Sequence, residues 1–138
     1  MENVKVCLII KNKNGDLLLQ LRDEEPEIDK WVLFGGGVGP GETNEQALAR
    51  EIKEELGFTI SGVKFFGEYK DNGIKQMIYV LDEPAAEGDL VLAEGKAMKF
   101  FSLTDIEGSA IGFNFKQIIR DYFEEIEKIY SNFIMNNK

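Results

Sequence analysis

Histidine is absent from this sequence of 138 residues, and cysteine and proline are scarce, with one and three residues respectively. Without histidine the chain cannot build a Ser-His-Asp or Cys-His nucleophile, a His-ligated zinc site or an imidazole general base. Cys7 cannot form an internal disulfide, which suits a reducing compartment. The apolar run at residues 6–10 is five residues long, too short for a signal-peptide core or a transmembrane helix. We therefore expect a cytoplasmic protein that does not bind membranes.

Positive charge is also in short supply. The chain has 16 Lys and Arg against 25 Asp and Glu residues, which gives a formal net charge of −9. This balance argues against a nucleic-acid partner, because binding along a phosphate backbone relies on basic side chains that displace counterions. If the protein binds phosphates, something other than surface lysines must neutralise them. A length of 138 residues with 43% hydrophobic content suits one compact domain, and we expect a single domain over residues 1–138.

The apolar pattern predicts strands, then a helix, then strands and a final helix, a mixed α/β order. Apolar-rich runs at residues 4–11 and 17–22 flank an Asn-Gly turn, and runs at 63–70 and 74–81 flank a second one, so each pair predicts a β-hairpin. A short strand is expected at residues 98–101. Thr43 and Gln46 have capping-box spacing, and Gly57 is typical of a helix end, so a helix is expected between Thr43 and Gly57.

The last helix is expected to begin at Asn114, which can act as its N-cap. Apolar residues then recur at three- and four-residue steps as far as Tyr130. This amphipathic pattern predicts a helix that packs on the sheet. The same face is also compatible with a homodimer interface.

Five glycines within residues 35–41 lead into the first helix, an arrangement that suggests a phosphate-binding loop. Neither common phosphate motif fits. The dinucleotide fingerprint needs glycine where Glu42 stands. The P-loop pattern needs lysine at the same residue, and a carboxylate there would repel the phosphate that the lysine should hold.

The carboxylate of Glu42 indicates a metal site instead. In the following helix Glu51, Glu54 and Glu55 fall on one face, separate from the apolar stripe. Glu42 lies just before the helix, and Arg50 is one turn before Glu54 and can orient it. Carboxylate oxygens in such a cluster suit Mg²⁺ or Mn²⁺. Taken alone, the acidic face is equally compatible with an ordinary solvated helix surface, because like charges at this spacing cost only a few tenths of a kcal/mol per pair.

The complete pattern resembles the signature of the Nudix hydrolase family. That signature is Gly, five residues, Glu, seven residues, then Arg-Glu-apolar-x-Glu-Glu-x-Gly-apolar, and this chain matches it at every position: Gly36, Glu42, Arg50, Glu51, Ile52, Glu54, Glu55, Gly57 and Phe58. A chance match is on the order of one in 10⁸ at ordinary residue frequencies. The resemblance implies the Nudix α/β/α sandwich, with a mixed β-sheet between helices. Phe34 and Gly39 depart from the family pattern, which often has proline and an acidic residue there.

The resemblance also implies a pyrophosphohydrolase that acts on a nucleoside diphosphate linked to another group, such as a nucleoside triphosphate or a nucleotide sugar. Glu51, Glu54 and Glu55 would bind Mg²⁺ (or Mn²⁺) together with the carbonyl of Gly35. Supporting roles fall to Gly36, to Glu42 beside the metal, and to Arg50, which would hold the catalytic carboxylates in place. One of the three glutamates would act as general base, and the sequence does not single one out.

Outside this signature, which we call the Nudix box (residues 36–58), fewer residues are candidates for the site. Glu94 is the best candidate for a further acidic group from a later loop, and Arg22 is a candidate phosphate ligand. Several aromatic residues are candidates for stacking on a base: Trp31, Phe65, Phe66, Tyr69 and Tyr79. For most of them a place in the hydrophobic core is the favoured alternative, and the sequence does not identify a base-binding pair. The expected partner is a small-molecule nucleotide. The alternative function is a Nudix-fold module that binds a nucleotide without cleaving it.

Overall fold

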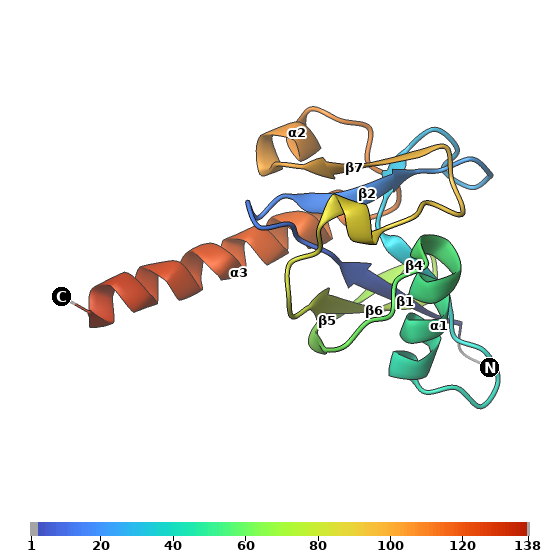
Figure 1. Ribbon diagram of the computed structural model, residues 1–138, viewed down its shortest axis with the longest axis horizontal. Helices are drawn as coiled ribbons and strands as arrows, with labels where there is room; N and C mark the ends of the chain where they lie inside the picture. Colours follow the sequence, from blue (N-terminus) through green and yellow to red (C-terminus); the bar gives the residue numbers. More distant parts are fainter. Residues whose placement is uncertain (1–2, 138) are drawn as a thin grey trace.

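The computed structural model describes residues 3–137, which form two β-sheets flanked by helices (Figure 1). The four-stranded sheet has the order β4-β1-β6-β5, and the three-stranded sheet has the order β3-β2-β7. The strands are β1 (Val4–Ile9), β2 (Leu17–Leu21), β3 (Trp31–Val32), β4 (Phe34–Gly37), β5 (Val63–Asp71), β6 (Ile74–Leu81) and β7 (Ala97–Phe101). The helices are α1 (Asn44–Leu56), α2 (Leu103–Glu107) and α3 (Phe115–Asn136), with a short 3₁₀ turn η1 (Glu87–Asp89).

The first predicted hairpin is wrong. β1 and β2 are joined by a tight turn, but they pair only at its base, through a Lys11–Leu17 bridge and a 2.9 Å bond from the Leu18 N–H to the Ile10 carbonyl. Consecutive residues of both strands are buried, and alternate side chains enter two different cores. Each strand therefore has a layer on both of its faces, and the two diverge into separate sheets.

The other strand predictions are confirmed. β5 and β6 form the second hairpin, with a register shift between Phe65 and Gly67, and β7 covers the short strand predicted at residues 98–101. In the four-stranded sheet β1 runs parallel to β6 and antiparallel to β4. The sheet is therefore mixed, as expected.

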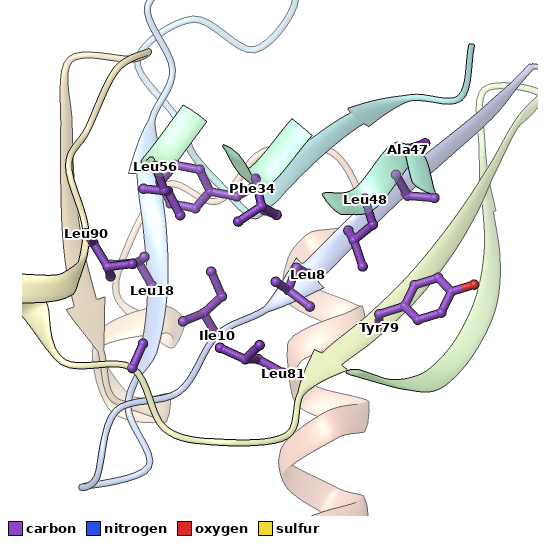
Figure 2. Close-up of a cluster of buried hydrophobic side chains, with 13 residues drawn as sticks. Leu8, Ile10, Leu18, Phe34, Ala47, Leu48, Leu56, Tyr79, Leu81 and Leu90 are labelled. Carbon is purple, nitrogen blue, oxygen red and sulfur yellow. The ribbon is translucent and has the colours of Figure 1, made fainter. Parts of the chain in front are cut away.

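Helix α1 follows the sequence prediction at both ends. The Thr43 hydroxyl accepts from the Gln46 N–H at 3.1 Å and the Gln46 side chain accepts from the Thr43 N–H at 2.9 Å, and Gly57 ends the helix in a left-handed conformation. The apolar side of the helix is fully buried and packs over Phe34 and the strands of the mixed sheet (Figure 2). Glu55 is buried together with these apolar residues, and Glu51 lies against Gly36 of the glycine-rich strand β4, so the acidic face is not fully separate from the apolar one as the sequence predicted.

Helix α3 begins where predicted, but Asn114 does not cap it with its side chain. Instead the Asn114 and Gln76 amides form two reciprocal hydrogen bonds of 2.9 and 2.7 Å, because the buried Gln76 side chain needs a partner. The first half of α3 packs into the second core, and the rest of the helix runs out beyond the sheets (Figure 1). Between residues 3 and 137, no helix combines the length and the apolarity needed to cross a membrane.

Candidate active site

The glycine-rich strand β4 passes so close to its neighbours that two positions exclude a side chain. Gly35 has a φ of +151°, and a Cβ there would overlap the backbone carbonyl of Val6 in β1. A Cβ on Gly36 would overlap the carboxylate of Glu51. Because neither position has a side chain, the carboxylates of α1 can lie directly against the β4 backbone.

Glu55 is the most deeply buried carboxylate near this strand, with 2% of its surface exposed. Its Oε1 accepts from the Gly35 N–H at 3.2 Å, and its Oε2 accepts from the Gln20 side chain at 3.1 Å. Burial raises the pKa of Glu55 to about 8, and the negative charges of Glu51 and Glu94 act in the same direction. The two hydrogen bonds therefore orient the Glu55 carboxylate, but both donors are neutral and no cation in the described part of the chain offsets its negative charge.

Arg50 organises the other carboxylates of the box. Its Nε and Nη2 donate to the two oxygens of Glu42 at 2.8 Å each, and Nη1 donates to Glu51 at 2.9 Å. Nη2 also donates to the Gly37 carbonyl at 3.0 Å, and Nη1 lies 3.6 Å from Glu54. This forked arrangement requires arginine, because lysine has no planar pair of donors.

The two acidic partners of Arg50 differ in their ionisation. The hydrogen bond from Arg50 lowers the pKa of Glu42 to about 2, helped by the Gly39 N–H, which donates to Glu42 at 2.7 Å. Burial raises the pKa of Glu51, although Arg50 opposes that shift. The negative charge of Glu51, which lies against β4, is thus less well compensated than that of Glu42.

Glu51 and Glu55 open onto a cavity of about 270 Å³. Glu94 lines the same cavity, and its loop is tied to the end of α1 by a 2.8 Å bond from the Ala93 N–H to the Glu55 carbonyl. Lys5 and Arg22 also line it. The cavity therefore brings an acidic group from α1 and the later loop together with two cations from β1 and the end of β2.

The structure places the predicted site residues in two groups. Those that line the cavity are Arg22, Gly35, Gly36, Glu51, Glu55 and Glu94. Arg50, Glu42 and Glu54 are not among the described residues that line it, and the Glu54 side chain is 51% exposed. Arg50 connects the two groups through its bonds to Glu42 and Glu51.

None of the five aromatic candidates is among the described residues that line the cavity, and most of them belong to the cores: Tyr79 is buried in the first, and Trp31, Phe66 and Tyr69 pack against the second. Phe65, Phe66 and Tyr69 line a separate groove beside α3. The aromatic side chains at the cavity are instead Phe113 and Phe115. The Phe113 ring lies 5.3 Å from the Lys5 ammonium and 5.6 Å from the Arg22 guanidinium.

Several cavity residues lie outside the sequence-based prediction, and Lys5, Gln20 and Phe113 are the ones that bear on the chemistry. Gln20 and Lys5 each interrupt an apolar strand with a polar side chain, and that interruption was the available signal. Phe113 adopts a φ of +51°, uncommon for a bulky residue, and nothing in its neighbouring residues indicates this.

The residues present fit a hard divalent cation. Two carboxylates with raised pKa values line one cavity beside the backbone of Gly35, and oxygen donors of this kind suit Mg²⁺ or Mn²⁺. In residues 3–137 no three acidic side chains already converge on a single point, since Arg50 holds Glu51 and lies beside Glu54. Binding a metal would therefore require these side chains to turn toward it.

Comparison with known proteins identifies the family. The family model for the NUDIX domain matches residues 1–122, and the chain belongs to the Nudix hydrolase family. Nucleoside triphosphatase NudI from Enterobacter sp. (strain 638) is 49% identical over 53 residues, a segment that covers only 38% of each protein. NudI from Escherichia coli O9:H4 (strain HS) matches to the same extent.

Solved structures agree with this assignment. The MutT Nudix hydrolase from Burkholderia pseudomallei is 30% identical, with a TM-score of 0.66 over 76% of this chain and 86% of its own. The NUDIX domain of Shewanella oneidensis NrtR, complexed with ADP ribose, is 17% identical, with a TM-score of 0.76 over 91% of this chain and 89% of its own, and supports the fold alone. The predicted family and the α/β/α sandwich fold are confirmed.

Proposed function

We propose that this protein hydrolyses a diphosphate bond in a nucleoside diphosphate linked to another group, by attack of water on phosphorus with Mg²⁺ as cofactor. One observation carries the proposal: the buried Glu55 and its neighbour Glu51 share a cavity with Lys5 and Arg22. A polyanionic substrate requires both kinds of group, cations for its phosphates and carboxylates that bind a metal. We further propose that residues 1–138 act as one domain in the cytoplasm.

The metal would be held by Glu51, Glu54 and Glu55 with the carbonyl of Gly35, and Mn²⁺ could replace Mg²⁺. A bound divalent ion supplies charge neutralisation for phosphate oxygens and lowers the pKa of a water molecule bound to it. The support from the structure is the negative charge of Glu55, which has no cationic partner within residues 3–137, the charge of Glu51, which Arg50 offsets only in part, and the close approach of β4 to α1.

The protein's own side chains position the reactants. Gln20 and the Gly35 N–H orient the Glu55 carboxylate, while Arg50 fixes Glu51 relative to Glu42. Lys5 and Arg22 line the cavity, and we assign them to the phosphate oxygens of the substrate. Because the chain has no histidine, we assign the proton of the attacking water to a carboxylate Oε atom of Glu51, Glu54 or Glu55, with Glu94 of the same cavity as the alternative.

Nucleoside triphosphates are the first substrates to test, because the relative NudI is a nucleoside triphosphatase. Nucleotide sugars and ADP-ribose complete the panel, the latter because the NrtR domain was solved with ADP ribose. Release of phosphate, pyrophosphate or nucleoside monophosphate in the presence of Mg²⁺ would be measured for each.

The same panel distinguishes the enzyme from a module that only binds nucleotides. We expect Glu54→Gln and Glu55→Gln to lower turnover by orders of magnitude while the fold stays intact. Glu45→Gln is the matched control, because Glu45 is an exposed residue in the first turn of the same helix. Nucleotide binding without product release, or equal rates in all three variants and the wild type, would refute the proposal.

A further inference from the structure

Helix α3 continues well past the part of the chain that the family model matches. That match ends at residue 122, whereas α3 continues to Asn136. Tyr122 is also the last buried residue among the described residues of the helix. The remaining residues form an extension, 123–136, whose first residues still border β5 across a groove and whose end projects beyond both sheets (Figure 1). At a rise of 1.5 Å per residue the extension is about 20 Å long.

The extension carries an apolar stripe on one side. The stripe consists of four large side chains with exposed fractions of 45%, 58%, 66% and 62%: Ile126, Ile129, Tyr130 and Phe133. Their helical spacing places them on the same face as Ile119 and Tyr122, which are buried in the core. The packing face of α3 thus continues into the extension, where the sheets no longer cover it.

Charge is distributed unequally along the extension. Glu124, Glu125, Glu127 and Lys128 lie in its first half, and residues 129–136 carry no charge at all. Parallel pairing with another copy would place the acidic halves side by side. Antiparallel pairing places the acidic half of each helix beside the uncharged half of the other, so like charges stay apart.

The aromatic residues at the base of the extension favour the same arrangement. The Tyr122 ring packs edge-on against Phe66 at 5.9 Å and against Phe123 at 5.6 Å, and both of these partners remain partly exposed. In an antiparallel pair, the uncharged end of one helix reaches this cluster on the other copy. An apolar surface therefore meets an apolar surface at both ends of the contact.

We propose that the occupant of the stripe is a second copy of this chain, with the two α3 extensions packed antiparallel about a two-fold axis near Ile129 and Tyr130. In this register Ile126 faces Phe133 of the partner subunit. The four stripe side chains expose roughly 100 Å² each, so the contact buries roughly 400 Å² per copy, plus part of the aromatic cluster. This is less than the roughly 800 Å² per partner of a standard interface, and the dimer is therefore a weak one, in concentration-dependent exchange with monomer.

The oligomeric state tests the proposal directly. Sedimentation velocity between about 2 and about 200 μM should show the wild type moving from monomer to dimer across this range. Ile129→Glu and Phe133→Glu should each remain monomeric at the highest concentration. Met135→Glu is the matched control, because Met135 is 69% exposed in the same extension but lies off the stripe, and it should dimerise like the wild type. A monomeric wild type, or a dimer that both stripe variants retain, would overturn the proposal.

Cysteine cross-linking tests the orientation without introducing a charge into the apolar stripe. Under mild oxidation, a mixture of I126C and F133C should give a disulfide between the two variants, whereas each variant alone should give little. The native Cys7 is buried and should not interfere. Cross-links within each variant alone would indicate parallel pairing and overturn the proposed register. Monomers that bind anionic lipid vesicles through the stripe would assign it to a membrane surface instead.

Discussion

The buried carboxylate of Glu55 predicts an unusual dependence of stability on pH in the metal-free protein. The pKa of Glu55 is about 8 in the folded state, against 4.5 for the same side chain in an unfolded chain. Between these values the folded protein holds a proton that the unfolded chain has lost. The free energy of unfolding therefore falls as the pH rises through this window, the opposite of what a salt-bridged carboxylate produces.

The size of this effect follows from the same two values. Each pKa unit corresponds to about 1.4 kcal/mol, so the window from 4.5 to about 8 amounts to about 5 kcal/mol. That is a large part of the stability of an ordinary domain. Glu55→Gln removes the titrating group and keeps the shape of the side chain. We expect this variant to gain stability over the wild type at pH 8 and to show little difference near pH 4.5.

Urea unfolding in the presence of a chelator at pH 5, 6.5 and 8 measures the difference between the two proteins. Glu45→Gln is the control for loss of a negative charge on the exposed side of the same helix. Added Mg²⁺ should stabilise the wild type most at pH 8, because a bound cation favours the ionised carboxylate. Parallel stability curves for the wild type and Glu55→Gln would show that this carboxylate does not pay a desolvation cost and would refute the reasoning.

Two further substitutions should misplace the carboxylates of the site without unfolding the protein. Arg50→Lys should lower turnover roughly 100-fold in product-release assays, because lysine cannot bind both oxygens of Glu42, while the melting temperature changes little. Gly36→Ala should lower turnover at least about tenfold, because the new methyl group displaces the carboxylate of Glu51, a flexible side chain that can move without unfolding the protein. Gly88→Ala in the η1 turn is its control, since nothing lies within 4 Å of a Cβ there and Gly88 is not among the described residues that line the cavity.

Local signals in the sequence predicted local structure well. The capping box at Thr43, the glycine end of α1 and the second hairpin are each specified by residues within a few positions of one another. The first hairpin failed for a different reason. The Asn-Gly turn does form, but the choice of sheet for β1 and β2 depends on two hydrophobic cores assembled from distant parts of the chain. The Asn114 side chain likewise does not cap α3, because it bonds to Gln76, a residue 38 positions away that only the tertiary fold brings close.

The candidate site also combines residues that local spacing predicted with residues that only the tertiary fold brings to it. Residues of the box are close in sequence, and their spacing along one helix was enough to predict that Glu51 and Glu55 lie together. Lys5 and Gln20 come from strands that precede the box, and Phe113 comes from a loop more than 50 residues after it. No pattern in the sequence connects these three to the box, because only the sheet topology brings them to the same cavity.

The net charge of −9 does not conflict with a polyanionic substrate. At physiological salt, charges are screened over about 8 Å, so a small ligand responds mainly to the groups that line its cavity. There the cations Lys5 and Arg22 stand beside carboxylates with raised pKa values, which favour either a proton or a metal ion. A long nucleic acid would instead meet the acidic surface outside the cavity. The same composition that disfavours a nucleic-acid backbone is therefore compatible with a single nucleotide bound together with a divalent cation.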